Sequence, residues 1–193
     1  MSKNVKNYKV EIIENNGKLD FISNIEEDSK SKVEISSSDN GYEMTLFFDE
    51  YVEVLITTSI EVDSLIKFKI LDNSKIIELI LAGKFNELEI NGDCSSLYFT
   101  GGCDYFDVNI NTNNLPKVTI NMAAVHNMNL INYSHNTVLY MSISPHLDKL
   151  FTNQNEIYAY IYEGYETAKN TKVLSPTKLY FIELDCEKVK LDF

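Results

Sequence analysis

Three histidines are the residues whose chemistry is easiest to name, and all lie in one short part of the chain. His126, His135 and His146 are each followed by a leucine four residues later, which predicts turn positions before successive strands. In a chain that coils back about every twenty residues, His126 and His146 would stack at the strand spacing of about 4.8 Å. Such a pair could bind a metal ion or respond to pH. Because no acid lies between Asp107 and Asp148 to complete a ligand set, we expect no metal and no cofactor, and His126 and His146 are only weak metal candidates.

A run of tyrosines near the end of the chain is the second candidate site. Residues 157–162 alternate strictly, so one strand face carries tyrosines and the other carries Ile157, Ala159 and Ile161. The smaller apolar face should point inward and leave the tyrosines exposed, where they could anchor a protein interface or stack on sugars. The alternative is that the tyrosines pack beneath the C-terminal strands. The candidate binding residues are Tyr158, Tyr160, Tyr162 and the nearby Tyr165.

Negative charge points to the kind of partner. The chain has 29 acidic residues against 17 cationic ones, a net charge of −12, and every cationic residue is a lysine. Phosphate and guanine recognition depend on cationic patches and on arginine, so we expect no direct nucleic-acid binding and a basic protein partner instead. The excess of acids is greatest in the first third of the chain. The candidate binding acids there are Glu26, Glu27, Asp28, Asp49, Glu50 and Glu53.

The middle of the chain is nearly free of charge. From Val108 to Leu147 the only formally charged residue is Lys117. In so acidic a chain, a neutral stretch predicts either coverage by the N-terminal strands or a face that binds a partner.

Sequence signatures of catalysis are lacking. The chain has no Gly-x-Ser-x-Gly elbow, no phosphate-binding glycine loop and no His-Glu-x-x-His motif. One Ser-x-x-Lys match, at Ser175 to Lys178, falls in a predicted loop. We therefore expect that the protein is not an enzyme.

The elements that must position these residues are strands. Apolar residues alternate from Tyr8 to about Ile60, with turn signals at 15–17 and 39–41, which predicts a small antiparallel sheet. Beyond residue 60 the pattern becomes apolar-x-x-apolar-x-apolar at intervals of about ten residues. The copies are Ser74-Ile77-Leu79, Phe85-Leu88-Ile90, Cys94-Leu97-Phe99, Cys103-Phe106-Val108, Leu115-Val118-Ile120, Val125-Met128-Leu130, His135-Val138-Tyr140 and Cys186-Val189-Leu191.

Two such units make one coil of about twenty residues, too short for a pair of helices and rich in strand-forming residues. Stacked coils bury the apolar side that a single unit leaves exposed. The sequence therefore predicts an all-β fold, a β-solenoid with two short strands per coil, preceded by the antiparallel sheet; the alternative is a β-sandwich. We expect one compact unit with an N-terminal cap over residues 1–60 and a solenoid region over 61–193.

Over residues 74–140 the repeat resembles the atypical leucine-rich repeats of some bacterial proteins, in which short Leu-x-x-Leu-x-Leu strands alternate with asparagine-containing turns. Phe, Val, Met or Cys often replaces leucine here. The resemblance implies a binding scaffold and supplies no catalytic residue.

The cysteines and the N-terminus indicate the compartment. Cys94, Cys103 and Cys186 form no zinc-binding pattern, and we expect reduced core residues, with a Cys94–Cys103 contact as the alternative. Met1 to Lys9 lacks an apolar signal region, and no apolar run is long enough for a membrane span. We expect a cytoplasmic protein that does not bind membranes.

These observations together predict a non-enzymatic, protein-binding domain, an acidic inhibitor or immunity protein that neutralises a basic partner. The alternatives are a nucleic-acid mimic that inhibits a defence nuclease, a carbohydrate-active β-helix and a fibre protein. The sequence leaves the oligomeric state open.

Overall fold

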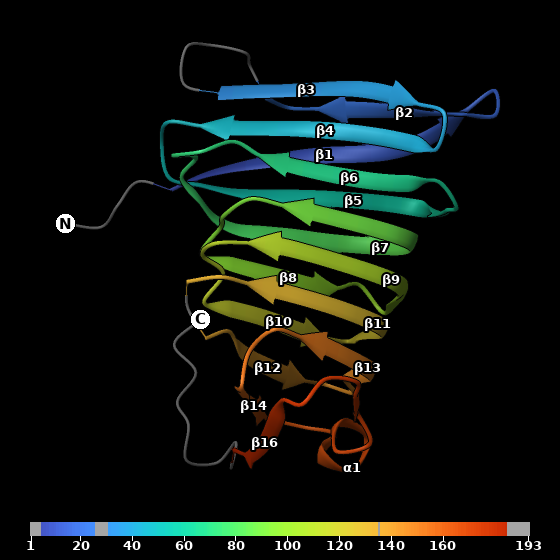
Figure 1. Cartoon of the computed structure of the whole chain (residues 1–193). Helices are drawn as coiled ribbons and strands as arrows, with labels where there is room; N and C mark the ends of the chain where they lie inside the picture. Colours follow the sequence, from blue (N-terminus) through green and yellow to red (C-terminus); the bar gives the residue numbers. More distant parts are fainter. Residues whose placement is uncertain (1–4, 26–30, 135, 185–193) are drawn as a thin grey trace.

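The alternating apolar residues form strands along almost the whole chain. A computed structural model describes residues 5–25, 31–134 and 136–184, and 70% of the structure is strand against 2% helix. The strands wind into a β-solenoid of about 6 turns, as the repeat predicts (Figure 1). Successive coils pair in parallel, which distinguishes the fold from the antiparallel β-sandwich that was the alternative.

Two walls enclose the core, and each wall is a ladder of strands. The ladder that contains the start of β7 is called the first sheet. The ladder that contains the end of β7 is called the second sheet. The first sheet has the order β2 (Lys18–Ser23), β1 (Lys6–Asn15), β5 (Val52–Val62), β7 (Ile76–Asn91), β8 (Ser96–Thr100), β10 (Lys117–Asn121), β12 (Val138–Ser142), β14 (Glu156–Ile161) and β16 (Lys178–Glu183).

The second sheet forms the opposite wall, nearer the viewer in Figure 1. It has the order β3 (Ser31–Ser38), β4 (Gly41–Phe48), β6 (Leu65–Ile70), β7, β9 (Cys103–Thr112), β11 (Ala123–Asn132), β13 (His146–Thr152) and β15 (Lys172–Val173). The short helix α1 (Tyr165–Ala168) follows β14.

Strand β7 bends and belongs to both walls. Its residues 78–82 pair with β8, whereas residues 85–91 pair with β9. Between them lies Gly83, where an added Cβ would come 2.3 Å from the Cγ2 atom of Thr58. The bend therefore brings the backbone so close to the preceding coil that only glycine fits.

The coils that contain β8, β10, β12 and β14 turn from the first sheet to the second through residues with left-handed backbone. Such residues follow β8, β10, β12 and β14: Gly101 and Gly102, Met122, Ile143 and Ser144, and Gly164. A β-branched residue such as Ile143, at φ 52°, is seldom found in this region. Lys117 pairs with Val138, and Val138 with Tyr158, so one coil is about twenty residues long, as predicted.

The core fills the space between the two walls. The buried repeat residues stack in columns from coil to coil; Phe85, Tyr105 and Val125 form one of them. The sequence-based frame was wrong in the second of these coils, because Tyr105 rather than Phe106 points inward. Phe106 and Asp107 face outward there and are the two consecutive outward positions of the repeat, so the frame that began at Cys103 began two residues too early.

Two other repeat copies were also placed out of frame. In β7 the buried residues are Ile76 and Leu79 rather than Ile77, and in β12 they are Leu139 and Met141 rather than Val138 and Tyr140. The copies at His135 and Cys186 include residues outside the described part of the chain.

The first strands form the expected antiparallel pairs, β1 with β2 and β3 with β4. Strands β1 and β4 also pair in parallel with β5 and β6, so each hairpin extends one wall of the solenoid. These strands lie at one end of the stack and do not cover the neutral stretch in the middle coils (Figure 1). The expected coverage by the N-terminal strands was therefore wrong.

Candidate binding surfaces

Strand β14 presents its tyrosines outward. Ile157, Ala159 and Ile161 are fully buried, whereas Tyr158 is 38% exposed, and Tyr160 and Tyr162 are partly exposed. This is the orientation expected from the size of the two strand faces.

Coil stacking extends these three residues into a larger group. Six tyrosines form this group, which we call the tyrosine row. Tyr98 comes from β8, Tyr140 from β12, Tyr158 and Tyr160 from β14, Tyr162 from the position directly after β14, and Tyr180 from β16. The rings of Tyr140 and Tyr160 stack at 5.5 Å, and those of Tyr158 and Tyr180 at 5.2 Å. Sequence reasoning missed three members, although Tyr140, Tyr160 and Tyr180 are spaced by about one coil length.

Polar contacts position several rings of the tyrosine row. The Asn121 amide donates to the Tyr98 hydroxyl over 2.5 Å. The Lys117 ammonium lies 5.3 Å from the ring centre of Tyr140. The Tyr180 hydroxyl donates to Glu156 over 3.4 Å, and the negative charge of Glu156 raises the pKa of Tyr158.

One hydroxyl beneath the tyrosine row lacks a partner. Thr119 lies between Tyr98 and Tyr140 in the strand register and is 6% exposed. Its Oγ1 atom is buried and makes no hydrogen bond. A buried polar atom of this kind costs free energy unless a partner supplies the missing bond.

The predicted acids do not all lie near the tyrosines. Glu53 pairs with Glu78 in the strand register, and the same register continues across the first sheet to Tyr158. Glu53 therefore lies on the same outer face as the tyrosine row. Asp49 forms an ion pair of 2.8 Å with Lys75, and Glu50 one of 2.5 Å with Lys6. Glu26, Glu27 and Asp28 lie outside the described residues.

Tyr165 does not belong to the tyrosine row. It lies at the start of α1, and its ring meets that of Phe181 edge to face at 6.5 Å. It is partly buried against the core, which indicates a packing role.

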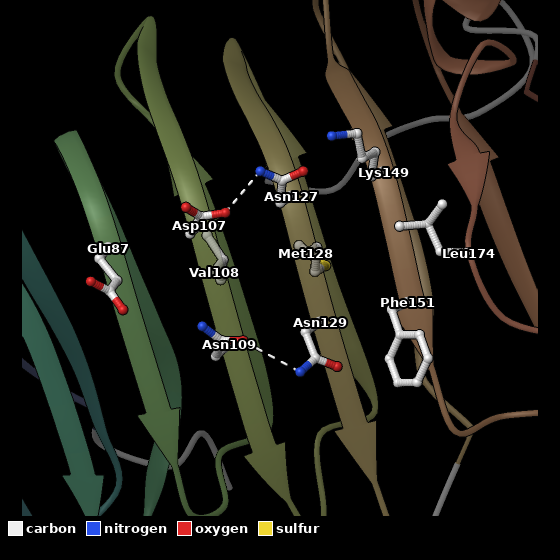
Figure 2. Close-up of a pocket in the computed structure, with 10 residues that line it drawn as sticks. All are labelled: Glu87, Asp107, Val108, Asn109, Asn127, Met128, Asn129, Lys149, Phe151 and Leu174. Atoms are coloured by element: carbon white, nitrogen blue, oxygen red, sulfur yellow. Dashed lines mark hydrogen bonds between the residues drawn. The ribbon is translucent and has the colours of Figure 1, made fainter.

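The outer face of the second sheet contains a hollow of about 290 Å³. We call it the amide groove, and Figure 2 shows the residues that line it. Asn127 donates to Asp107 over 2.8 Å, and Asn129 donates to Asn109 over 3.3 Å. Lys149, Phe151 and Leu174 border the groove on the side of β13 and β15, and Glu87 borders it on β7.

The histidines take part in a cluster on the same sheet. His126 Nδ1 lies 2.7 Å from Asp148, His126 Nε2 lies 3.3 Å from Asp104, and His146 Nε2 lies 2.5 Å from Asp148. The His126 ring also stacks on Phe106 at 4.7 Å. The two contacts of His126 are both hydrogen bonds only when both ring nitrogens carry a proton.

The cluster differs from the predicted stack of turn residues. His126 lies inside β11 and His146 begins β13, while the partner of His146 in the register is Ala124. His135 lies outside the described residues. Asp104 and Asp148 flank His126 in the fold. Among the described residues, however, no group of three or more His, Cys, Asp or Glu side chains could hold a metal ion.

Hydrogen bonds to the histidines also shift the ionisation of Asp148. Partial burial opposes its negative charge, but the hydrogen bonds and positive charge of His126 and His146 outweigh this effect. The pKa of Asp148 therefore lies below its usual value. The cluster ties together β9, β11 and β13 from three successive coils.

No family model, curated protein or solved structure matches this chain. Functional inference therefore rests on the tyrosine row, the amide groove and the histidine cluster. In addition, the described residues contain no helix of the length and apolar character needed to cross a membrane.

The described cysteines do not suggest reactive thiols. Cys94 and Cys103 are both free, and burial raises the pKa of Cys94 to about 12 and also raises that of Cys103. A thiol reacts as its thiolate, so raised pKa values oppose nucleophilic chemistry at both positions. Cys186 lies outside the described residues.

Proposed function

We propose that the protein is a non-enzymatic binding domain that uses the tyrosine row to hold a basic protein partner, as a cytoplasmic inhibitor or immunity protein does. The observation that carries the proposal is the continuous outer face of the first sheet. An uncharged column there, Ile80, Tyr98, Thr119, Tyr140, Tyr160 and Ile182, runs across six strands of the sheet.

The dimensions and chemistry of this column suit a protein interface. At the strand spacing of about 4.8 Å, the column is about 24 Å long. Protein interfaces have cores depleted in charge and rich in tyrosine, with charged residues around them. Glu53, Glu78, Lys117 and Glu156 are the charged residues that flank the column.

The charge of the whole chain favours a basic partner. The net charge of −12 would accelerate encounter with a cationic protein and repel nucleic acid. A stack of hydrogen-bonded coils also provides a rigid platform, in keeping with the resemblance to atypical leucine-rich repeats. A rigid platform loses little conformational entropy when it binds.

Capture of the partner from native cells, followed by measured binding, tests the proposal. We expect a basic protein whose association slows as salt rises, because the screening length falls to about 8 Å at physiological ionic strength. Replacing both Tyr158 and Tyr160 with Ala should weaken its binding by about thirtyfold or more, the effect of losing interface anchors. The matched control is Phe151→Ala, which removes an aromatic ring from the second sheet.

Stability must be separated from binding. Tyr160→Ala should change the free energy of unfolding by no more than about 0.5 kcal/mol, since the side chain lies on an outer face. A thermal melt measures this change. A large fall in melting temperature would show that the row is structural, and unchanged affinity in the double variant would exclude it as the interface.

A further inference from the structure

We propose that the amide groove on the second sheet binds a neutral, linear oligosaccharide. The groove lies on the wall opposite the tyrosine row, so this inference stands or falls independently of the protein-binding proposal. It rests on four features of the described residues: the polar ladder, an unpartnered acceptor, an exposed apolar border and the distribution of charge.

The polar ladder supplies hydrogen-bonding groups at a regular interval. Asp107 and Asn127 are neighbours in the strand register, as are Asn109 and Asn129. Parallel strands lie about 4.8 Å apart, a distance similar to the length of one pyranose ring in a chain. A linear sugar that crosses β9 and β11 would therefore meet a polar side chain from each strand with successive rings.

An unpartnered acceptor lies within this ladder. The amide nitrogen of Asn129 donates to Asn109, which directs its Oδ1 atom toward Phe151 (Figure 2). This oxygen is buried and accepts no hydrogen bond. A buried acceptor without a hydrogen bond is unfavourable, and a ligand hydroxyl that donates to it removes that cost. Because Phe151 is 44% exposed, rotation of its side chain can uncover the oxygen for a ligand hydroxyl.

An apolar border lies beside the polar ladder. Phe151 is 44% exposed and Leu174 is 59% exposed. The backbone N–H of Leu174 donates to the Leu150 carbonyl over 2.8 Å, so this residue is held against β13. An aromatic ring beside amide and carboxylate groups suits a sugar, whose C–H face is apolar and whose edge carries hydroxyls.

The charges around the groove favour a neutral ligand. Glu87 and Asp107 are neighbouring acids on one side, and Lys149 is a cation on the other. Asp107 and Lys149 are separated by two strand steps, about 10 Å. The acids would repel an anion, and the lysine would repel a cation. A free amino acid carries both charges but is too short to reach Asp107 and Lys149 together.

Calorimetric titration of the full chain with four sugars tests this inference: cellohexaose, chitohexaose, xylohexaose and maltohexaose. We expect saturable binding of at least one of them. Phe151→Ala should weaken that binding by about tenfold, and Asn129→Ala should weaken it by a similar factor. Tyr133→Ala is the matched control, an exposed aromatic residue outside both the amide groove and the tyrosine row, and should leave sugar affinity unchanged.

Two results would overturn the proposal. One is the absence of saturable binding for all four sugars up to about 10 mM, a concentration at which a Kd of about 1 mM is still measurable. The other is binding that Tyr158→Ala abolishes and Phe151→Ala leaves intact, because it would move the sugar site to the first sheet. A thermal melt of each variant verifies that it remains folded during the titrations.

Discussion

The two walls of the solenoid share one core but present different chemistry to the solvent. The outer face of the first sheet is built from stacked tyrosines, with few charges between them. The outer face of the second sheet carries amides, carboxylates and the histidine cluster. The two outer faces of a solenoid can therefore differ in composition, because the outward residues of each wall come from different strands of the coil.

The cause of the difference lies in how the strands alternate. In β14 of the first sheet, inward and outward residues alternate without interruption. In β9, β11 and β13 of the second sheet, two consecutive residues face outward after the buried residues Tyr105, Val125 and Leu147. This irregularity recurs in each coil and brings Phe106, His126 and Asp148 into contact.

The largest expected effect is a difference in stability between substitutions at two adjacent aromatic residues, one facing inward and one facing outward. Tyr105 is fully buried and donates to the carbonyls of Leu81 and Thr100, and burial raises its pKa. Tyr105→Ala should lower the free energy of unfolding by about 3–5 kcal/mol, as expected for a large aromatic residue removed from a core. Phe106→Ala should cost about 1 kcal/mol or less.

Urea unfolding of both variants measures the difference. Tyr105→Phe is the control that keeps the ring and removes only the hydrogen bonds, at a cost of about 1–3 kcal/mol. Equal losses for Tyr105→Ala and Phe106→Ala would contradict the inward position of Tyr105 and the outward position of Phe106.

A smaller effect is expected at Asp148, where the second sheet is tied together by charge. Because its pKa is lowered in the folded state, the ionised form stabilises the fold above the unfolded value of about 4. This contribution is lost as the pH falls through the folded value. The side chain is 40% exposed, so Asp148→Asn should cost no more than about 1 kcal/mol at pH 7.

Unfolding experiments at pH 7 and at about pH 3 measure this dependence, since the second lies below the ordinary aspartate pKa of about 3.9. The stability difference between the wild type and Asp148→Asn should shrink at the lower pH. Glu163→Gln, a change outside the cluster, is the control. A difference that grows on acidification would contradict the assigned hydrogen bonds.

The smallest expected effect concerns the first sheet, at the unpartnered hydroxyl of Thr119. Valine has nearly the same shape and no polar atom, so Thr119→Val removes the cost of a buried unmet group. We expect stabilisation of up to about 1 kcal/mol, measured by urea unfolding. Thr100→Val, in the same sheet, is the control. Destabilisation by Thr119→Val would contradict the prediction, because it would show that the hydroxyl has a hydrogen-bond partner in solution.

Sequence reasoning was sufficient for the strands, the coil length and the direction of the β14 side chains. Each follows from local periodicity, which depends on neighbours in the chain. The resemblance to atypical leucine-rich repeats was carried by the same local pattern and indicated the solenoid, but not the groove. The binding roles of Tyr158, Tyr160, Tyr162 and Glu53 stay predictions.

The tertiary structure decided which residues meet across coils. The repeat frame placed Phe106 in the core, because Cys103, Phe106 and Val108 fit the apolar spacing as well as Tyr105, Val108 and Ile110 do. The sequence distance from Asp104 to Asp148 likewise concealed that both acids contact His126. Contacts between coils depend on register, and register is set by the stacking of whole strands, so the amide groove and the histidine cluster became visible only in three dimensions.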